Sequence, residues 1–235
     1  MKKAVLNILA TIALATGLVA CLPARAGEAK TENRTTEKFS GIEVGSVFEV
    51  EILQGADCAV KLDVYDGDLL AKITTEVRKG VLYVETKDIK EVKGKFKVTI
   101  TAPAYDRIGI SGAANAYTTS SIKAANLKLD CSGAAEVKLA ITADNVDADF
   151  SGASQVELNG SASMVSMDAS GASHFNGHGF EINTCKLDAS GAAKTELNVS
   201  KILEVDASGA ASVLYKGSPD KKVDISGAAS VKASK

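Results

Sequence analysis

The stretch DASGAA occupies residues 188–193, and seven versions of it follow one another along the chain. The others are DASGAA at 206–211, DASGAS at 168–173, DFSGAS at 149–154, DCSGAA at 130–135, DISGAA at 224–229 and a weaker copy, GISGAA, at 109–114. Aligned on the serine of SGA, successive copies lie 21, 19, 19, 20, 18 and 18 residues apart. Such a period is typical of a solenoid, in which each unit buries its face against the next.

The residues around each SGA alternate between apolar and polar. In the second copy Leu127, Leu129 and Cys131 alternate with polar residues, and the alternation resumes after SGA at Val137. This period of two indicates strands with one buried face. Two strands joined by SGA, with a variable segment before the next copy, make one coil. We therefore predict an all-β fold, a right-handed parallel β-helix of about seven coils of roughly 20 residues, with irregular loops in the variable segment.

The glycine of SGA has a conformational explanation. A corner between two strands needs either a positive φ or a close approach of backbones, and glycine allows both. We predict that these glycines form a structural corner column: Gly112, Gly133, Gly152, Gly171, Gly191, Gly209 and Gly227.

An aspartate stands two residues before the serine in six copies: Asp130, Asp149, Asp168, Asp188, Asp206 and Asp224. The favoured interpretation is that each side chain hydrogen-bonds its own corner. Stacked coils would place these carboxylates roughly 4.8 Å apart, where they repel one another. A ladder of cations such as Ca²⁺ is the alternative, because calcium prefers oxygen ligands.

The first residues resemble an export signal. Lys2 and Lys3 precede an apolar run, and Ala24-Arg25-Ala26 is a cleavage pattern, so residues 1–26 are predicted to be a signal peptide. LVAC at 18–21 resembles a lipobox, which would instead remove residues 1–20 and leave Cys21 lipidated. Both alternatives predict that the protein is exported.

The remaining chain divides by composition. Residues 27–37 are polar and aperiodic and are predicted to be a flexible leader. Residues 38–235 are predicted to be one β-helical domain, with a strand-rich part at 38–105 and the SGA repeats at 106–235. The strand-rich part is expected to form the first, irregular section of the stack and to cover its end.

Three stretches of this N-terminal part, FSGIEVGSVFEVEILQG (39–55), DGDLLAKITTEVRKGVLYVE (66–85) and KVTITAP (97–103), precede the repeats, and LYKGSP (214–219) with ISGAASVK (225–232) closes them. In this order they resemble the head GIN domain family of autotransporter adhesins, over about residues 39–232. The resemblance implies an exported, mostly Gram-negative β-helical protein with no established biochemical activity. We therefore expect an adhesin-like envelope module for binding or surface structure, without catalysis, in the periplasm or at the outer membrane or surface of a Gram-negative cell.

A carbohydrate-active enzyme, a polysaccharide lyase or hydrolase, is the alternative, because parallel β-helices also house such enzymes. Glycoside hydrolysis needs two carboxylates at a set separation in a cleft, whereas the aspartate column lies on a repetitive face without an aromatic platform. The only histidines, His174 and His178, would stand about 13 Å apart on a straight strand, so we interpret them as surface residues. No catalytic residue is predicted.

Composition limits the partners. Once Lys2, Lys3 and Arg25 are removed, 24 basic residues face 29 acidic ones, and the basic residues are scattered. Nucleic acid is therefore not expected as a partner, and a membrane only through a lipid on Cys21. A surface glycan or an envelope protein is expected, and no cofactor. Cys58, Cys131 and Cys185 are predicted to be free thiols, because the last two fall in different coils and different columns.

Overall fold

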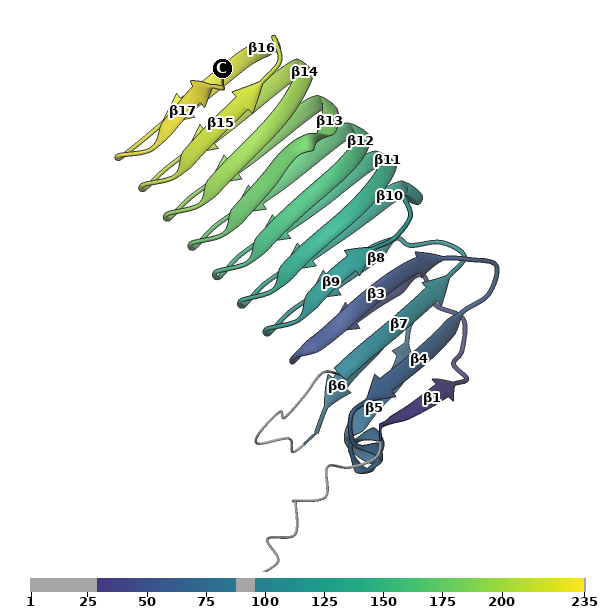
Figure 1. Ribbon diagram of the computed structural model, residues 1–235. Coiled ribbons are helices and arrows are strands. Elements are labelled where there is room, and N and C mark those ends of the chain that lie inside the picture. The colour runs from purple at the N-terminus through teal and green to yellow at the C-terminus, as the bar shows by residue number, and fades with distance from the viewer. Residues whose placement is uncertain (1–28, 88–95, 235) are drawn as a thin grey trace, which may run out of the picture.

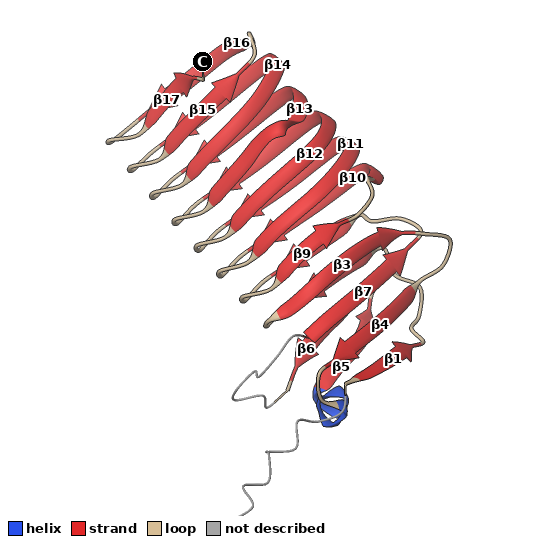
Figure 2. Ribbon diagram, in the orientation of Figure 1, coloured by secondary structure: helices blue, strands red, loops and turns tan. Residues whose placement is uncertain are grey.

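The fold is a β-solenoid, as predicted. A computed structural model describes residues 29–87 and 96–234, and the predicted signal peptide and Cys21 lie outside them. Stacked parallel strands form about seven turns, which Figure 1 shows as a row of rungs from the N-terminal strands to β16 and β17. The corners lie in line along one edge of the stack (Figure 2).

The repeats form the regular part of the stack. The strands are β8 (Arg107–Ile110), β9 (Asn115–Thr118), β10 (Ile122–Cys131), β11 (Glu136–Phe150), β12 (Gln155–Ala169), β13 (His174–Ala189), β14 (Lys194–Ala207), β15 (Ser212–Lys216), β16 (Asp220–Ile225) and β17 (Ser230–Ala233). The first part of β11 pairs with β9 and its second part with β10, both in parallel. Each long strand therefore bends and contributes to two walls, which we call the post-corner wall (the strand parts that follow a corner) and the pre-corner wall (those that precede one).

The length differences between coils are absorbed inside the strands. The predicted irregular loops are wrong for β11–β14, which run without interruption from one corner to the next. Register shifts occur instead between β12 and β13 near Glu157 and between β13 and β14 after Asn176. A bulge accommodates an extra residue while the neighbouring ladder hydrogen bonds stay in place. Loops occur in two of these segments, at 119–121 between β9 and β10 and at 217–219 between β15 and β16.

The corners stack on one another through their backbones. All seven glycines of the corner column have φ between 67° and 74°. The alanine amide after each glycine donates to the carbonyl of the corner below, at 2.7 Å in every case, as from Ala192 to Gly171. A Cβ on Gly191 would stand 2.8 Å from that same carbonyl oxygen. Both the positive φ and the close backbone approach therefore require glycine here.

The stack continues into the N-terminal part, as expected. The strands there are β1 (Lys30–Arg34), β2 (Gly41–Val44), β3 (Phe48–Gln54), β4 (Ala59–Val64), β5 (Ile73–Arg78), β6 (Val81–Thr86) and β7 (Phe96–Ala102), with a 3₁₀ helix, η1 (Gly67–Lys72). Strands β2 and β3 stack in parallel on β8 and β9, and on their other side on β6 and β7. Ser46, with φ of 74°, lies directly below Gly112 and forms a further corner in which glycine and serine are exchanged.

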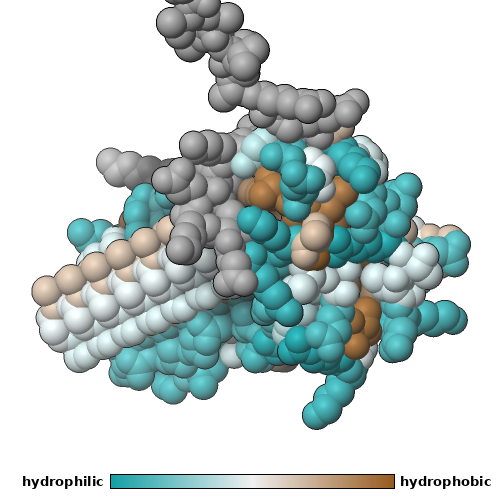
Figure 3. Space-filling model, turned by 90° about the horizontal axis from the view of Figure 1, so that it is seen from below, coloured by the Kyte–Doolittle hydropathy of each residue, from teal (hydrophilic) through white to brown (hydrophobic). Residues whose placement is uncertain are grey.

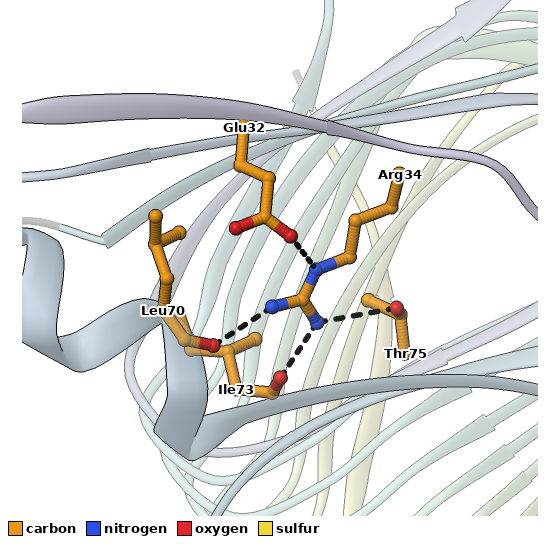
Figure 4. A network of polar contacts seen from close by, with 5 residues as sticks. All are labelled: Glu32, Arg34, Leu70, Ile73 and Thr75. Atoms are coloured by element: carbon orange, nitrogen blue, oxygen red, sulfur yellow. Dashed lines mark hydrogen bonds and ion pairs between the residues drawn. The ribbon is translucent and has the colours of Figure 1, made fainter.

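Antiparallel strands close the N-terminal end. Strand β4 pairs with β7, β5 pairs with β6, and β1 pairs with β4. The predicted flexible leader over 27–37 is therefore wrong for Lys30–Arg34. The guanidinium of Arg34 donates to the carbonyls of Leu70 and Ile73 at 2.7 and 2.6 Å and to Thr75, and pairs with Glu32 at 2.8 Å (Figure 4). These hydrogen bonds attach β1 to η1 and β5.

The core is a column of aliphatic and small side chains between the two walls. Inner residues such as Val205 and Val213 are at most 1% exposed. Cys131 and Cys185 are buried free thiols and Cys58 is half-buried and free, as predicted, and burial raises the pKa of the two buried thiols. Ser154, Ser173 and Thr195 are also buried, and their hydroxyls have no hydrogen-bond partner among the described residues.

Candidate binding surface

The predicted aspartate column lies on the outside of the pre-corner wall. Strand register places the six carboxylates one above another: Asp130, Asp149, Asp168, Asp188, Asp206 and Asp224. Asp130 is half-buried and the other five are exposed. Within the described part of the chain, none of the six makes a side-chain hydrogen bond to its corner, so that expectation is wrong. The serine and alanine amides of each corner already donate to the coil below.

Among the described residues, salt bridges to the column occur only at its N-terminal end. Arg107 pairs with Asp130 at 2.7 Å and with Glu43 at 2.5 Å. The weak copy has Gly109 where the other copies have aspartate, and a Cβ there would stand 2.0 Å from a Glu43 carboxylate oxygen. The missing aspartate thus leaves space for Glu43, which reaches Arg107 in its place.

The middle of the column remains mutually repulsive. Burial, followed by the charges of Asp188 and Asp149, raises the pKa of Asp168. A shallow groove of about 200 Å³ lies over Asp168, Asp188 and Asp206 and the serines of their corners. No group of three or more histidine, cysteine or acidic side chains that could hold a metal ion occurs in residues 29–87 and 96–234.

The two histidines lie on the post-corner wall and meet at one carboxylate. His178 Nε2 is 2.7 Å and His174 Nε2 3.8 Å from the Glu196 carboxylate, and Lys194 is 2.5 Å from it. Lys194, ahead of the histidines, lowers the pKa of Glu196. Both imidazoles therefore reach one carboxylate, which the straight-strand separation did not predict, and the pairing of β13 with β14 shifts register between Asn176 and Glu181.

A polar groove runs beside this cluster. One section, of about 240 Å³, is lined by Glu136, Lys138, Gln155, Glu157, His174 and Asn176 on β11, β12 and β13. A second section, of about 420 Å³, shares Glu136 and Lys138 and adds Asn115, Tyr117, Val47, Phe48 and Phe96. We call the two sections together the polar groove.

Tyr117 gives the polar groove an aromatic face. Its ring is half-exposed, and the Lys97 amine lies 5.7 Å from the ring centre. Lys97 also pairs with Glu51 at 2.9 Å, which together with Tyr117 raises the pKa of Lys97. Aromatic, amide and carboxylate groups in one groove are suited to a hydroxyl-rich or peptide ligand.

Sequence reasoning missed this groove. Its residues stand four and six positions after the serines of successive copies, so they share two outward columns of the post-corner wall. The residue type in those columns changes from coil to coil. The search for identical residues in each copy led to the aspartates as the candidate site instead. The sequence signal for the groove was that these outward residues differ between coils while the SGA corners stay the same.

The corner ridge is the third distinct surface. The second residue of each corner is glycine and the third is alanine, and both are exposed. Figure 3 shows an even ridge of intermediate to mildly hydrophobic residues along one side, next to hydrophilic surface. The ridge offers no side chain longer than alanine at these two positions, so it carries no candidate chemistry.

These features define a β-solenoid with outward polar columns and no assembled nucleophile–base pair among the described residues. The chain belongs to the head GIN domain family: the family model described as "Putative auto-transporter adhesin, head GIN domain" matches residues 38–219. A search of curated proteins finds no match. None of the helices in the described residues is long and apolar enough to cross a membrane.

Solved structures share the fold. A putative adhesin from Bacteroides fragilis aligns with a TM-score of 0.82 at 21% identity, over 88% of this chain and 97% of that one. A putative adhesin from Parabacteroides merdae aligns with a TM-score of 0.71 at 20% identity, over 89% and 97%. A putative lipid binding protein from Parabacteroides distasonis aligns with a TM-score of 0.70 at 17% identity, over 89% and 98%. At these identities the likeness establishes the fold alone.

Proposed function

We propose that the protein is an adhesin-like binding module of the Gram-negative envelope, without catalysis, and that its ligand is a surface glycan bound in the polar groove. The observation that carries this is the groove itself: Tyr117 supplies a ring face, and Gln155, Glu157 and Asn176 supply hydrogen-bonding groups along successive coils. Sugar rings stack on aromatic faces and hydrogen-bond to amides and carboxylates. The match to an adhesin-type family supports the same class.

The groove proposal is tested on a glycan array with matched variants. Tyr117→Ala and Gln155→Ala remove a ring face and an amide from the groove, and Lys186→Ala changes an exposed side chain on the opposite wall. We expect the Tyr117 change to weaken binding at least ~10-fold, as for an aromatic hot spot, and the Lys186 change to leave binding unaltered. Equal binding by all three variants would contradict the groove as the site.

The alternative, a carbohydrate-active enzyme, is tested with the same purified protein. Incubation with the bound polysaccharide should yield retention without product. New reducing or unsaturated ends would instead indicate hydrolysis or lysis. No arrangement in the described residues favours this second activity.

Export is part of the same proposal. We propose that residues 1–26 or 1–20 are removed and that the protein occupies the periplasm or the outer membrane surface. Mass spectrometry of the native protein should find either an unmodified start at Gly27 or a lipidated start at Cys21. An intact Met1 in the native protein would contradict export.

A further inference from the structure

The two ends of the stack are finished differently. At the N-terminal end, Leu70 in η1 and Ile73 in the antiparallel strand β5 are 4% and 3% exposed. At the other end, β16 pairs only with β14 and β17 only with β15, among the described strands. The outer edges of β16 and β17 therefore present backbone N–H and C=O groups that no described strand pairs with (Figure 1).

The core is also open at this end. Ile225 occupies an inner column and is 51% exposed, whereas Ala207, its partner one coil below, is 0% exposed. Val223 and Val231 are partly buried, although Val205 and Val213 beneath them are at most 1% exposed. Another layer of strands would bury these side chains and satisfy the backbone groups.

We propose that this end stacks on the same end of a second copy of the chain, through a two-fold axis that runs perpendicular to the strands and crosses β16 at Val223 and β17 at Val231. Such an axis reverses the strand direction, so β16 pairs antiparallel with β16 of the second copy and β17 with β17. Both open edges are then paired at once. The interface is isologous and closes as a dimer without leaving a further edge.

Charge selects the register. Residues directly opposite in an antiparallel pair share a face, so β16 can meet itself with Lys222, Val223 or Asp224 at the axis. Lys222 at the axis puts two lysines opposite each other, and Asp224 at the axis puts two aspartates opposite each other. Val223 at the axis puts Lys222 opposite Asp224 of the second copy, twice by symmetry.

The same axis suits the second pair of strands. With Val231 opposite Val231, Ser230 lies opposite Lys232 and Ala229 lies opposite Ala233, so no like charges meet. Lys222 already pairs with Glu204 at 2.7 Å in its own chain and would lie between two carboxylates. Opposite charges placed directly across two strands are stabilising, and like charges are destabilising.

One inner residue limits the strength of the dimer. Lys221 occupies an inner column that holds Leu203 one coil below, and its amine donates to the Tyr215 hydroxyl at 2.7 Å. An inward-pointing lysine reduces the apolar area available at an edge. The association is therefore expected to be weak and dependent on concentration.

The test is a charge-swap cycle measured by sedimentation velocity on the purified protein, from dilute solution to the solubility limit. Lys222→Asp and Asp224→Lys each replace two attractive pairs with two repulsive ones, and each should raise the dimer dissociation constant roughly tenfold or more. The double variant restores opposite pairs in exchanged positions and should recover dimerisation. Lys186→Asp, with the same charge change in the column of Lys222 but in an inner coil, is the control and should dimerise like the wild type.

Lys221→Leu gives a second readout, because it continues the inner apolar column to the end of the stack. It should tighten the dimer by a measurable factor. A protein that stays monomeric up to its solubility limit, with Lys221→Leu monomeric as well, would overturn the proposal. A dimer indifferent to the single swaps, or a double variant no better than the singles, would overturn it too.

Discussion

At the scale of single residues, replacing a corner glycine should cost stability for two separate reasons, the positive φ and the close approach of the neighbouring coil. Gly191 has a positive φ and a carbonyl 2.8 Å from the position of an added Cβ, whereas Gly80 has a positive φ and nothing within 4 Å. The pair separates backbone strain from the clash between coils. It also shows why the SGA glycine recurs in every coil.

Gly191→Ala should therefore destabilise the fold far more than Gly80→Ala. The left-handed conformation costs an alanine about 1–2 kcal/mol, which Gly80→Ala should show alone. The added clash with a stacked backbone should bring Gly191→Ala to about 3 kcal/mol or more. Chemical denaturation measures both, and equal losses for the two variants would contradict the stacking argument.

Replacing the buried hydroxyls should have the opposite effect and stabilise the fold. Ser173 and Thr195 are buried without hydrogen-bond partners in the described structure, although most other members of their columns are alanine or valine. An unsatisfied buried hydroxyl costs about 1–3 kcal/mol. Ser173→Ala and Thr195→Val should each raise the free energy of unfolding, by about 1 kcal/mol.

Ser212→Ala is the control for this pair, because the Ser212 hydroxyl is partly exposed and water can satisfy it. It should change the stability by less than about 0.5 kcal/mol. A loss of stability in Ser173→Ala would mean that the hydroxyl has a partner, such as a buried water.

At the scale of elements, β1 depends on one side chain. Arg34 accounts for contacts to two carbonyls of the η1–β5 segment, and β1 otherwise adds only an edge to β4. Arg34→Ala leaves those carbonyls without their charged donor and should cost about 1–3 kcal/mol locally. Hydrogen exchange should show the amides of β1 losing protection while those of β11–β14 keep theirs.

Arg78→Ala is the matched control. Arg78 pairs with Glu76 at 2.6 Å, but both side chains are more than half exposed. Exposed ion pairs contribute little, so the exchange of β1 amides should be unaltered. Protected β1 amides in Arg34→Ala would show that β1 is held by the ladder with β4 instead.

The same elements show which parts of the fold could be predicted from the sequence. The corner glycines and the alternation around them predicted the coils, because identical local requirements recur at a fixed period. β1 could not be predicted, because KTENR has no alternation of apolar residues and its strand is held by Arg34 from a distance. The polar groove was missed because its outward residues differ from coil to coil. The His–Glu196 cluster was missed because it lies at a register shift between β13 and β14 that the repeat spacing does not indicate.

At the scale of the whole molecule, the aspartate column links stability to pH. The pKa of Asp168 is raised in the folded state, first by burial and then by Asp188 and Asp149. The folded state then binds more protons than the unfolded one, so stability falls as pH rises from the ordinary carboxyl pKa through the raised one. Asp168→Asn should therefore be more stable than the wild type at neutral pH, and this advantage should vanish in acid.

Asp130→Asn, in the same column, should behave in the opposite way at neutral pH, because it removes the partner of Arg107. Thermal melts across pH compare the two variants, and added salt should shrink both effects by screening. An Asp168→Asn variant that is less stable than the wild type at neutral pH would mean that something attractive holds its carboxylate.

Calcium binding is the attractive interaction that could hold these carboxylates. A cation ladder would make the wild type melt higher in calcium than in chelator through ligand linkage. We expect the two melts to coincide, because the five outer aspartates are exposed and no described group of carboxylates is arranged to hold a metal. A calcium-dependent shift that Asp188→Asn reduces would establish the ladder instead.

The stacked corners also bear on how such a molecule changes length over generations. Each corner contacts its neighbour through the backbone, and the alanine amide donates to the carbonyl of the corner below at the same 2.7 Å in every coil. A tandem duplication of one repeat unit in the gene, from corner to corner, would therefore insert a complete rung without disturbing either end. The number of coils can therefore change, whereas the antiparallel strands that cover the N-terminal end are needed once.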